Sequence, residues 1–172
     1  MAVSGKLVSG GILGITAAFG FGVYYAQVYG YYETLSQGEV ALTSVMSGVP
    51  ERIPVSTFEG IDADSSPIRY RACFKTPLST ALLTETFTTI TKFEPRNAPD
   101  WFSCFDANQI GEDLKTGLAT AYMGEANFEF GIDRIVAIYD DGRGFVWHQI
   151  NDCGDKLYDG SQASDNCPER DQ

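Results

Sequence analysis

The only histidine of the chain, His148, lies in the sequence Phe145-Val-Trp-His-Gln-Ile150. An imidazole can serve as a general base or a metal ligand near neutral pH. Either role needs a second titratable group, and no such partner can be assigned near His148 from the sequence. A lone histidine in an aromatic strand is far more often a hydrogen-bonded structural residue. We therefore predict no catalytic residue, no metal site and no cofactor.

The four cysteines are the other residues with chemical potential: Cys73, Cys104, Cys153 and Cys167. They contain no C-x-x-C pair, which argues against a thioredoxin-type couple or a zinc knuckle, and no C-x-x-C-H for haem attachment. An even number of cysteines predicts two disulfides, with three possible connectivities, provided that the domain is exported to an oxidising compartment, as the charge bias described below indicates. We favour Cys73 with Cys104 and Cys153 with Cys167, because the second bond would close a Gly- and Asp-rich tail that has few apolar anchors.

Asp62 and Asp64 resemble the opening of a calcium-binding loop. The glycine and the glutamate that such a loop needs at later fixed positions are missing, so a plain turn is the better interpretation. The sequence also lacks a nucleophile elbow, a Walker loop, a dinucleotide fingerprint and a kinase-type histidine box. An enzyme is therefore the weakest of the functional classes that we consider.

The chain begins with a long uncharged segment, residues 7–32, which precedes all of the residues considered so far. At about 1.5 Å per residue, a helix over this range exceeds the hydrocarbon core of roughly 30 Å, so it can span a membrane. Lys6 precedes it, Glu33, Glu39 and Glu51 follow it, and Arg52 is the first basic residue after it. This bias predicts a cytoplasmic N-terminus (residues 1–6) and an exported C-terminal part.

A cleaved signal peptide is the competing interpretation of the same segment. The segment is longer than a typical apolar signal region, it has no A-x-A processing site, and no cysteine follows closely enough for lipidation. We therefore favour an uncleaved anchor.

Small residues recur at every fourth position of the segment, a pattern that allows close approach of another membrane helix. We predict a helix-packing stripe of Gly10, Gly14, Ala18, Gly22, Ala26 and Gly30. Tyrosines cluster near the end of the segment, where their amphipathic rings suit the headgroup layer. The expected interface anchors are Tyr24, Tyr25, Tyr29, Tyr31 and Tyr32.

The chain has 172 residues and a net charge of −11, and because Lys6 is the only charged residue before Glu33, the rest carries −12. Such a domain repels phosphate backbones, which argues against nucleic-acid binding and favours basic partners. A hydrophobic content of 44% is that of a folded domain, not of a disordered acidic tail.

Residues 33–67 are rich in turn-forming residues and predict a stalk or linker that packs on the domain. Residues 68–172 predict a small α+β domain with an antiparallel sheet and two or three helices, stabilised by disulfides. Its expected strands are 68–74, 132–139 and 145–150, the last two joined by the hairpin connector 140–144. A helix or a strand follows Pro77, and a clearer helix begins at Asp106, with a capping box to Gln109 and with Ile110, Leu114 and Leu118 on one face.

Three blocks of the sequence, 62–74, 101–107 and 144–151, resemble a family of uncharacterised single-span proteins from alphaproteobacteria related to Rhodobacter and Paracoccus. The likeness runs over nearly the whole chain. It implies a bacterial source and an inner-membrane location, with a single span and a periplasmic C-terminal domain. Members are sometimes labelled histidine kinase, but this chain has neither the room nor the motifs for a kinase core. The resemblance implies no catalytic residues.

The function that uses both the span and the domain is a non-catalytic accessory subunit of an inner-membrane complex, respiratory or photosynthetic. Its span would pack in the bilayer on a core subunit, and its domain would cap the complex on the periplasmic side. The alternatives are an anchored acidic module that docks a basic partner such as a c-type cytochrome, and a transient assembly factor or periplasmic sensor.

Overall fold

The structure is a computed structural model that describes residues 4–161, 164 and 167–168. The chain divides into two compact units, residues 1–32 and 33–172. Of the expected cytoplasmic N-terminus, residues 1–3 lie outside the described residues.

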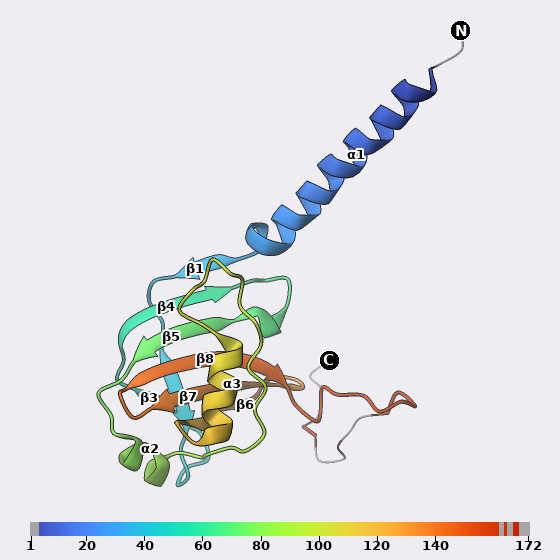
Figure 1. Cartoon of the computed structure of the whole chain (residues 1–172). Coiled ribbons are helices and arrows are strands. Elements are labelled where there is room, and N and C mark those ends of the chain that lie inside the picture. The colour runs from blue at the N-terminus through green and yellow to red at the C-terminus, as the bar shows by residue number, and fades with distance from the viewer. Residues whose placement is uncertain (1–3, 162–163, 165–166, 169–172) are drawn as a thin grey trace. The chain divides into compact units, whose positions relative to one another are not determined.

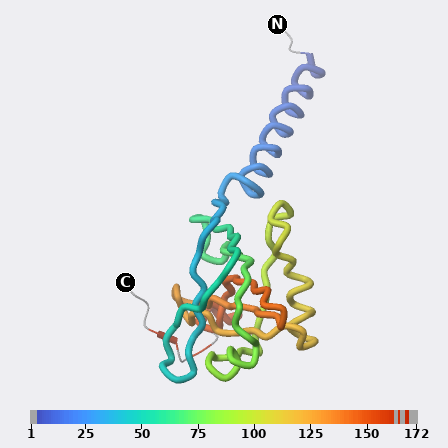
Figure 2. The backbone as a smooth tube through the Cα atoms, turned by 90° about the vertical axis from the view of Figure 1, so that its left-hand side faces the viewer, coloured from blue at the N-terminus to red at the C-terminus, as the bar shows by residue number. Residues whose placement is uncertain are grey.

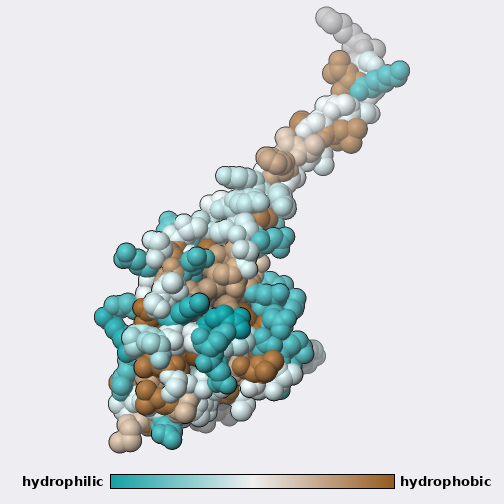
Figure 3. All heavy atoms as spheres, turned by 60° about the vertical axis from the view of Figure 1, so that its left-hand side comes forward, coloured by the Kyte–Doolittle hydropathy of each residue, from teal (hydrophilic) through white to brown (hydrophobic). Residues whose placement is uncertain are grey.

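The first unit is a helix, α1 (Gly5–Tyr25), which continues as one π-helical turn over Ala26–Gly30. Gly5–Gly30 is long and apolar enough to cross a membrane, by length and composition. None of its described residues is buried. Figure 3 shows mainly hydrophobic and neutral residues along its visible side, with a hydrophilic residue near the N-terminal end. The helix thus covers nearly all of the predicted span 7–32.

The second unit is built on a six-stranded antiparallel sheet with the strand order β1-β4-β5-β8-β7-β6 (Figure 1). Its strands are β1 (Glu33–Leu35), β4 (Ser56–Asp62), β5 (Arg71–Lys75), β6 (Ala119–Glu129), β7 (Ile132–Tyr139) and β8 (Arg143–Ile150). A separate hairpin pairs β2 (Val40–Thr43) with β3 (Pro50–Ile53). A 3-10 turn (Pro67–Arg69) precedes β5. The two helices are α2 (Thr80–Thr86) and α3 (Ala107–Thr116). The predicted α+β class, with its antiparallel sheet and disulfides, is confirmed.

The two faces of the sheet are covered by different elements, so that the unit has three layers. One face packs on the β2–β3 hairpin and on α2, in a core of Val40, Leu42, Ile53, Ala72, Phe74, Leu83, Phe87, Tyr122, Val136, Ile138 and Val146. The opposite face carries Phe145 and Trp147, and Phe105 from the segment before α3 packs edge-on against both rings. Figure 2 shows the hairpin on one side of the sheet and α3 on the other.

The N-cap of α3 follows the prediction, but its capping box does not. The Asp106 carboxylate accepts hydrogen bonds from the backbone N–H groups of Asn108 and Gln109, as an N-cap should. The Gln109 side chain does not return to the cap and instead donates to Asp113. The helix ends at Gly117, whose φ of +79° is easily adopted only by glycine. Leu118, expected on the helix face, therefore lies beyond the helix and is exposed.

Residues 33–67 differ most from the prediction, because they form strands β1 to β4 and not a linker. The apolar residues Val40, Leu42, Ile53 and Ile61 are buried, while the turn-forming residues between them connect short strands. The expected strand 68–74 also begins later, at Arg71, because Pro67 starts the 3-10 turn. The strand β6 is absent from the prediction, while the 132–150 hairpin is confirmed.

Candidate functional site

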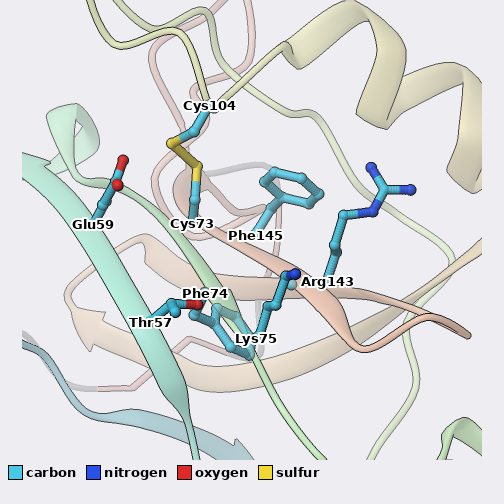
Figure 4. Close-up of a pocket in the computed structure, with 9 residues that line it drawn as sticks. Thr57, Glu59, Cys73, Phe74, Lys75, Cys104, Arg143 and Phe145 are labelled. Carbon is cyan, nitrogen blue, oxygen red and sulfur yellow. A yellow bond between two sulfur atoms is a disulfide. The ribbon is translucent and has the colours of Figure 1, made fainter.

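The candidate site is a groove of about 250 Å³ on the α3 face of the sheet, beside the Cys73–Cys104 disulfide (Figure 4). Two cross-strand rows of residues form it. Glu59, Cys73 and Phe145 are direct neighbours across β4, β5 and β8, and Lys75 and Arg143 are direct neighbours in the next row. The groove therefore has an apolar floor of disulfide and aromatic ring, with cations on one side and a carboxylate on the other.

A β-bulge shapes the wall of the groove at Thr57. The pairing of β4 with β5 shifts between Ser56 and Phe58, which leaves Thr57 as the extra residue. Its φ is +48°, a left-handed conformation that is a genuine outlier for a β-branched residue. Strained residues of this kind persist only where the surrounding structure holds them, and they cluster at ligand sites.

The cations of the groove are held differently. Arg143 Nε donates to Asp141 Oδ2 at 2.7 Å, and its guanidinium lies 4.7 Å from the centre of the Tyr139 ring. Hydrogen bonds from the Arg143 backbone N–H and side chain lower the pKa of Asp141, so this carboxylate stays ionised. Lys75 is exposed and forms no ion pair with any residue that the structure describes.

His148 lies elsewhere, on the opposite face, where both of its ring nitrogens are hydrogen-bonded. Nδ1 is 2.6 Å from the Pro67 carbonyl oxygen, and Nε2 accepts a hydrogen bond from Arg134 Nε at 2.9 Å. The ring is sandwiched between Tyr70 and Phe128, with centroid distances of 4.8 and 4.1 Å. Burial lowers its pKa to about 4, so the imidazole is neutral at pH 7. Through these contacts, His148 connects the 3-10 turn, β7 and the surrounding aromatic rings, which is a structural role.

Two other buried ionisable side chains also hold the fold together. Arg71 donates to four carbonyl oxygens, those of Ile68, Tyr70, Arg96 and Asn97, and so joins the 3-10 turn to the segment before α3. The Asp113 carboxylate accepts from the Tyr139 hydroxyl at 2.7 Å, and burial together with this bond raises the pKa of Tyr139. The sequence analysis singled out neither Arg71 nor Asp113.

The disulfides are Cys73–Cys104 and Cys153–Cys167, which is the connectivity that the sequence favours. The first joins β5 to the segment before α3, and the second closes the tail. Asp62 accepts from the Ala63 backbone N–H within the turn expected there. Among the described residues, no three His, Cys, Asp or Glu side chains could together hold a metal ion.

In α1, a Cβ atom added at Gly10, Gly14 or Gly22 would meet nothing within 4 Å, so these positions of the expected stripe are open on the isolated helix. Near the end of the span, the rings of Tyr25 and Tyr29 lie 5.7 Å apart. Tyr24, Tyr25, Tyr29 and Tyr31 are all exposed. At Gly30 an added Cβ would lie 3.7 Å from the Tyr25 carbonyl oxygen, so the two expected surfaces of the helix stay predictions.

Residues 40–168 match a protein family described as a family of unknown function, DUF6446. The chain belongs to this family. The DUF6446 match begins at β2, and it includes both disulfides, the groove and His148, whereas α1 and β1 lie outside it. No curated protein and no solved structure matches the chain.

The sequence analysis missed the groove, since Lys75 and Arg143 are far apart in the chain and meet only when β5 pairs with β8. Cys73 was the one available signal. In the strand pattern it alternates with apolar residues and shares the face of Lys75, but the position of Arg143 follows only from the register of the sheet.

Proposed function

We propose that the chain is a single-span protein of the bacterial inner membrane, with α1 across the bilayer and residues 33–172 in the periplasm. The observation that carries the proposal is a long apolar helix, with Lys6 as its only charged residue and none of its described residues buried, followed directly by a disulfide-bonded domain. Lys6 in the first turn of the helix and Glu33 after its end favour a cytoplasmic N-terminus. Disulfides persist in oxidising compartments such as the periplasm.

Within that membrane, the chain acts as a non-catalytic accessory subunit of an electron-transfer complex, respiratory or photosynthetic. The stripe Gly10, Gly14, Ala18, Gly22, Ala26 and Gly30 supports this role, because small residues let a second helix pack closely in lipid. The periplasmic domain then caps the assembly next to the core subunit on which the span packs.

An anchored docking module is the second candidate, and the charge of the domain favours it. The chain after Lys6 carries −12, which would steer a basic soluble protein such as a c-type cytochrome toward the membrane. A transient assembly factor would use the same surfaces without remaining in the complex.

Reporter fusions at the C-terminus test the topology. A periplasmic alkaline phosphatase should be active when fused after the last residue, and a fluorescent protein that matures only in the cytoplasm should be dark. Mass spectrometry of the purified chain should find the α1 segment still attached. Loss of this segment would identify a cleaved signal peptide and contradict the anchor.

Affinity purification of the full-length chain from native membranes in a mild detergent tests the accessory role. The chain should co-elute with a haem- or quinone-containing enzyme at a fixed ratio. Purification of the chain alone, at high yield, would contradict stable membership. A basic cytochrome that binds at low salt and is released as salt rises would instead support the docking module.

A further inference from the structure

We propose that the groove beside the Cys73–Cys104 disulfide binds a small organic carboxylate, with the anion between Lys75 and Arg143 and an apolar body over Phe145 and the disulfide. The inference goes beyond the proposed membrane role and does not depend on it. It rests on the placement of charge, the floor of the groove and the bulge in its wall (Figure 4).

Two cationic side chains lie next to each other in the groove. Lys75 and Arg143 lie directly opposite each other on adjacent strands and line the same groove. Like charges in this position destabilise a sheet unless an anion compensates for them. Asp141 forms a close ion pair with Arg143, whereas the charge of Lys75 acts on Asp141 only at longer range. A bound carboxylate would compensate for the second charge.

The Arg143 guanidinium has hydrogen-bond donors that are available to a ligand. Arg143 uses Nε and its backbone N–H to hold Asp141, and no hydrogen bond to a described residue uses its terminal nitrogens. The planar guanidinium is therefore held in place with further donors available. A carboxylate suits such donors better than a neutral group does, because hydrogen bonds between ionised groups are shorter and stronger.

The floor and the volume of the groove restrict the apolar body of the ligand. The groove is floored by Cys73, Cys104 and the Phe145 ring, and its volume of about 250 Å³ is below the range of about 300–1,000 Å³ typical for drug-sized ligands. The occupant is therefore small, with an aromatic or short alkyl body. Glu59 in the neighbouring row repels a second negative charge, so a monocarboxylate is favoured over a dicarboxylate.

The test uses the full-length chain in an uncharged detergent and the probe 3-phenylpropionate, followed by NMR shifts of backbone amides. Saturable shifts should appear at Cys73, Lys75 and Arg143. The neutral analogue 3-phenylpropan-1-ol, which partitions into micelles at least as well, should give no saturable shifts there. Binding should weaken as salt rises.

Variants locate the anion. Lys75→Gln should weaken binding about fivefold or more, since it removes one charged donor. Arg143→Lys, which keeps the charge but loses the planar donors, should weaken it less than Arg143→Gln does. Glu59→Gln should maintain or strengthen binding. Lys115→Gln, a change of another exposed lysine that pairs with Glu112, is the matched control and should have no effect.

Three results would overturn the proposal: no saturable shift at about 10 mM probe, equal binding of the alcohol, or unchanged binding by Lys75→Gln. Weaker binding in Glu59→Gln would also contradict it, because removal of a nearby negative charge should not weaken the binding of an anion. Spectra of each variant without probe should overlay on the wild type outside the groove, which separates lost binding from lost folding.

Discussion

Arg134 donates a hydrogen bond from Nε to Nε2 of His148, and this bond fixes the charge of the only histidine in the chain. An imidazole that accepts at Nε2 must carry its proton on Nδ1, where the Pro67 carbonyl oxygen accepts it. Protonation of Nε2 would place a second positive charge against Arg134, inside an aromatic sandwich. The folded state therefore favours the neutral form of His148.

His148 should make the stability of the chain depend on pH. Its pKa is about 4 in the fold and 6.5 ordinarily, so between these values only the unfolded chain takes up the proton. Stability from this source is complete above pH 6.5 and should fall by about 3 kcal/mol as the pH is lowered through that window. Urea unfolding of the full chain at pH 7 and pH 4.5 would measure the fall. In His148→Gln, which is less stable at pH 7, the decrease between these two pH values should be much smaller. An equal decrease would mean that carboxylates account for it.

Arg71 should be among the most sensitive positions in the domain. Arg71→Met buries an apolar side chain in place of the guanidinium and leaves four carbonyl acceptors, in partly buried positions, without their donor, and we expect a loss of about 2–4 kcal/mol in the free energy of unfolding. Arg52→Met is the control, because Arg52 pairs with Glu39 on the surface and should cost no more than about 1 kcal/mol. Similar losses in the two variants would show that the hydrogen bonds of Arg71 contribute little.

Removal of the Cys73–Cys104 bond should destabilise the domain. The bond spans 31 residues and joins β5 to the segment before α3, so Cys73→Ala with Cys104→Ala should lower the free energy of unfolding by about 2–4 kcal/mol. The matched variant lacks Cys153–Cys167, which spans 14 residues in the tail, and should lose less. Peptide mapping of the non-reduced wild type should recover these two pairs, and any other pairing would contradict the structure.

Two glycine-to-alanine changes should act in opposite directions. A Cβ atom at Gly144 would overlap the ring of Phe74 on the adjacent strand, so Gly144→Ala should cost about 1–3 kcal/mol through overpacking. At Gly111, inside α3, the nearest atom to an added Cβ lies 4.0 Å away, so Gly111→Ala should stabilise by about 0.5–1 kcal/mol. Thermal melts of the two variants would show shifts of opposite sign, and a stable Gly144→Ala protein would show that Phe74 has room to move.

Gly14→Leu combined with Gly22→Leu should reduce co-purification of the proposed partner complex. The two side chains would fill the open stripe and hold a neighbouring helix at a distance. Ile12→Leu with Ile15→Leu is a control elsewhere on the helix and should leave co-purification unchanged. The same yield of partner from the glycine variants would show that the stripe does not contact the partner.

The α1 helix and the β7–β8 hairpin could be predicted from the sequence because their signals are local. An uncharged run identifies the helix, and two β-rich runs around Asp140-Asp-Gly-Arg-Gly144 identify the hairpin. The first half of the domain could not be predicted in this way. β1 is three residues long, and β2 and β3 have four each, which is too short for a clear alternating pattern. β1 is stabilised by pairing with β4, and the β2–β3 hairpin is stabilised by packing on the sheet. Neither contact is visible in local sequence.

The groove depends even more on long-range contacts. Cys73, Lys75 and Arg143 meet because β5 pairs with β8 in one register, and a shift of one residue would move Lys75 to the other face. The β4 bulge that places Thr57 in its wall has no glycine to signal it, because a threonine occupies the left-handed position. The disulfide pairing was easier, since only three connectivities exist for four cysteines.

The Cys153–Cys167 bond has a practical consequence for protease mapping. Lys156 lies between the two cysteines and is exposed, so trypsin can cut the chain after it. The two pieces would stay covalently joined, and a gel run without reductant would show an uncut protein. Protease accessibility of the tail, and any topology deduced from it, should therefore be scored only after the disulfides have been reduced.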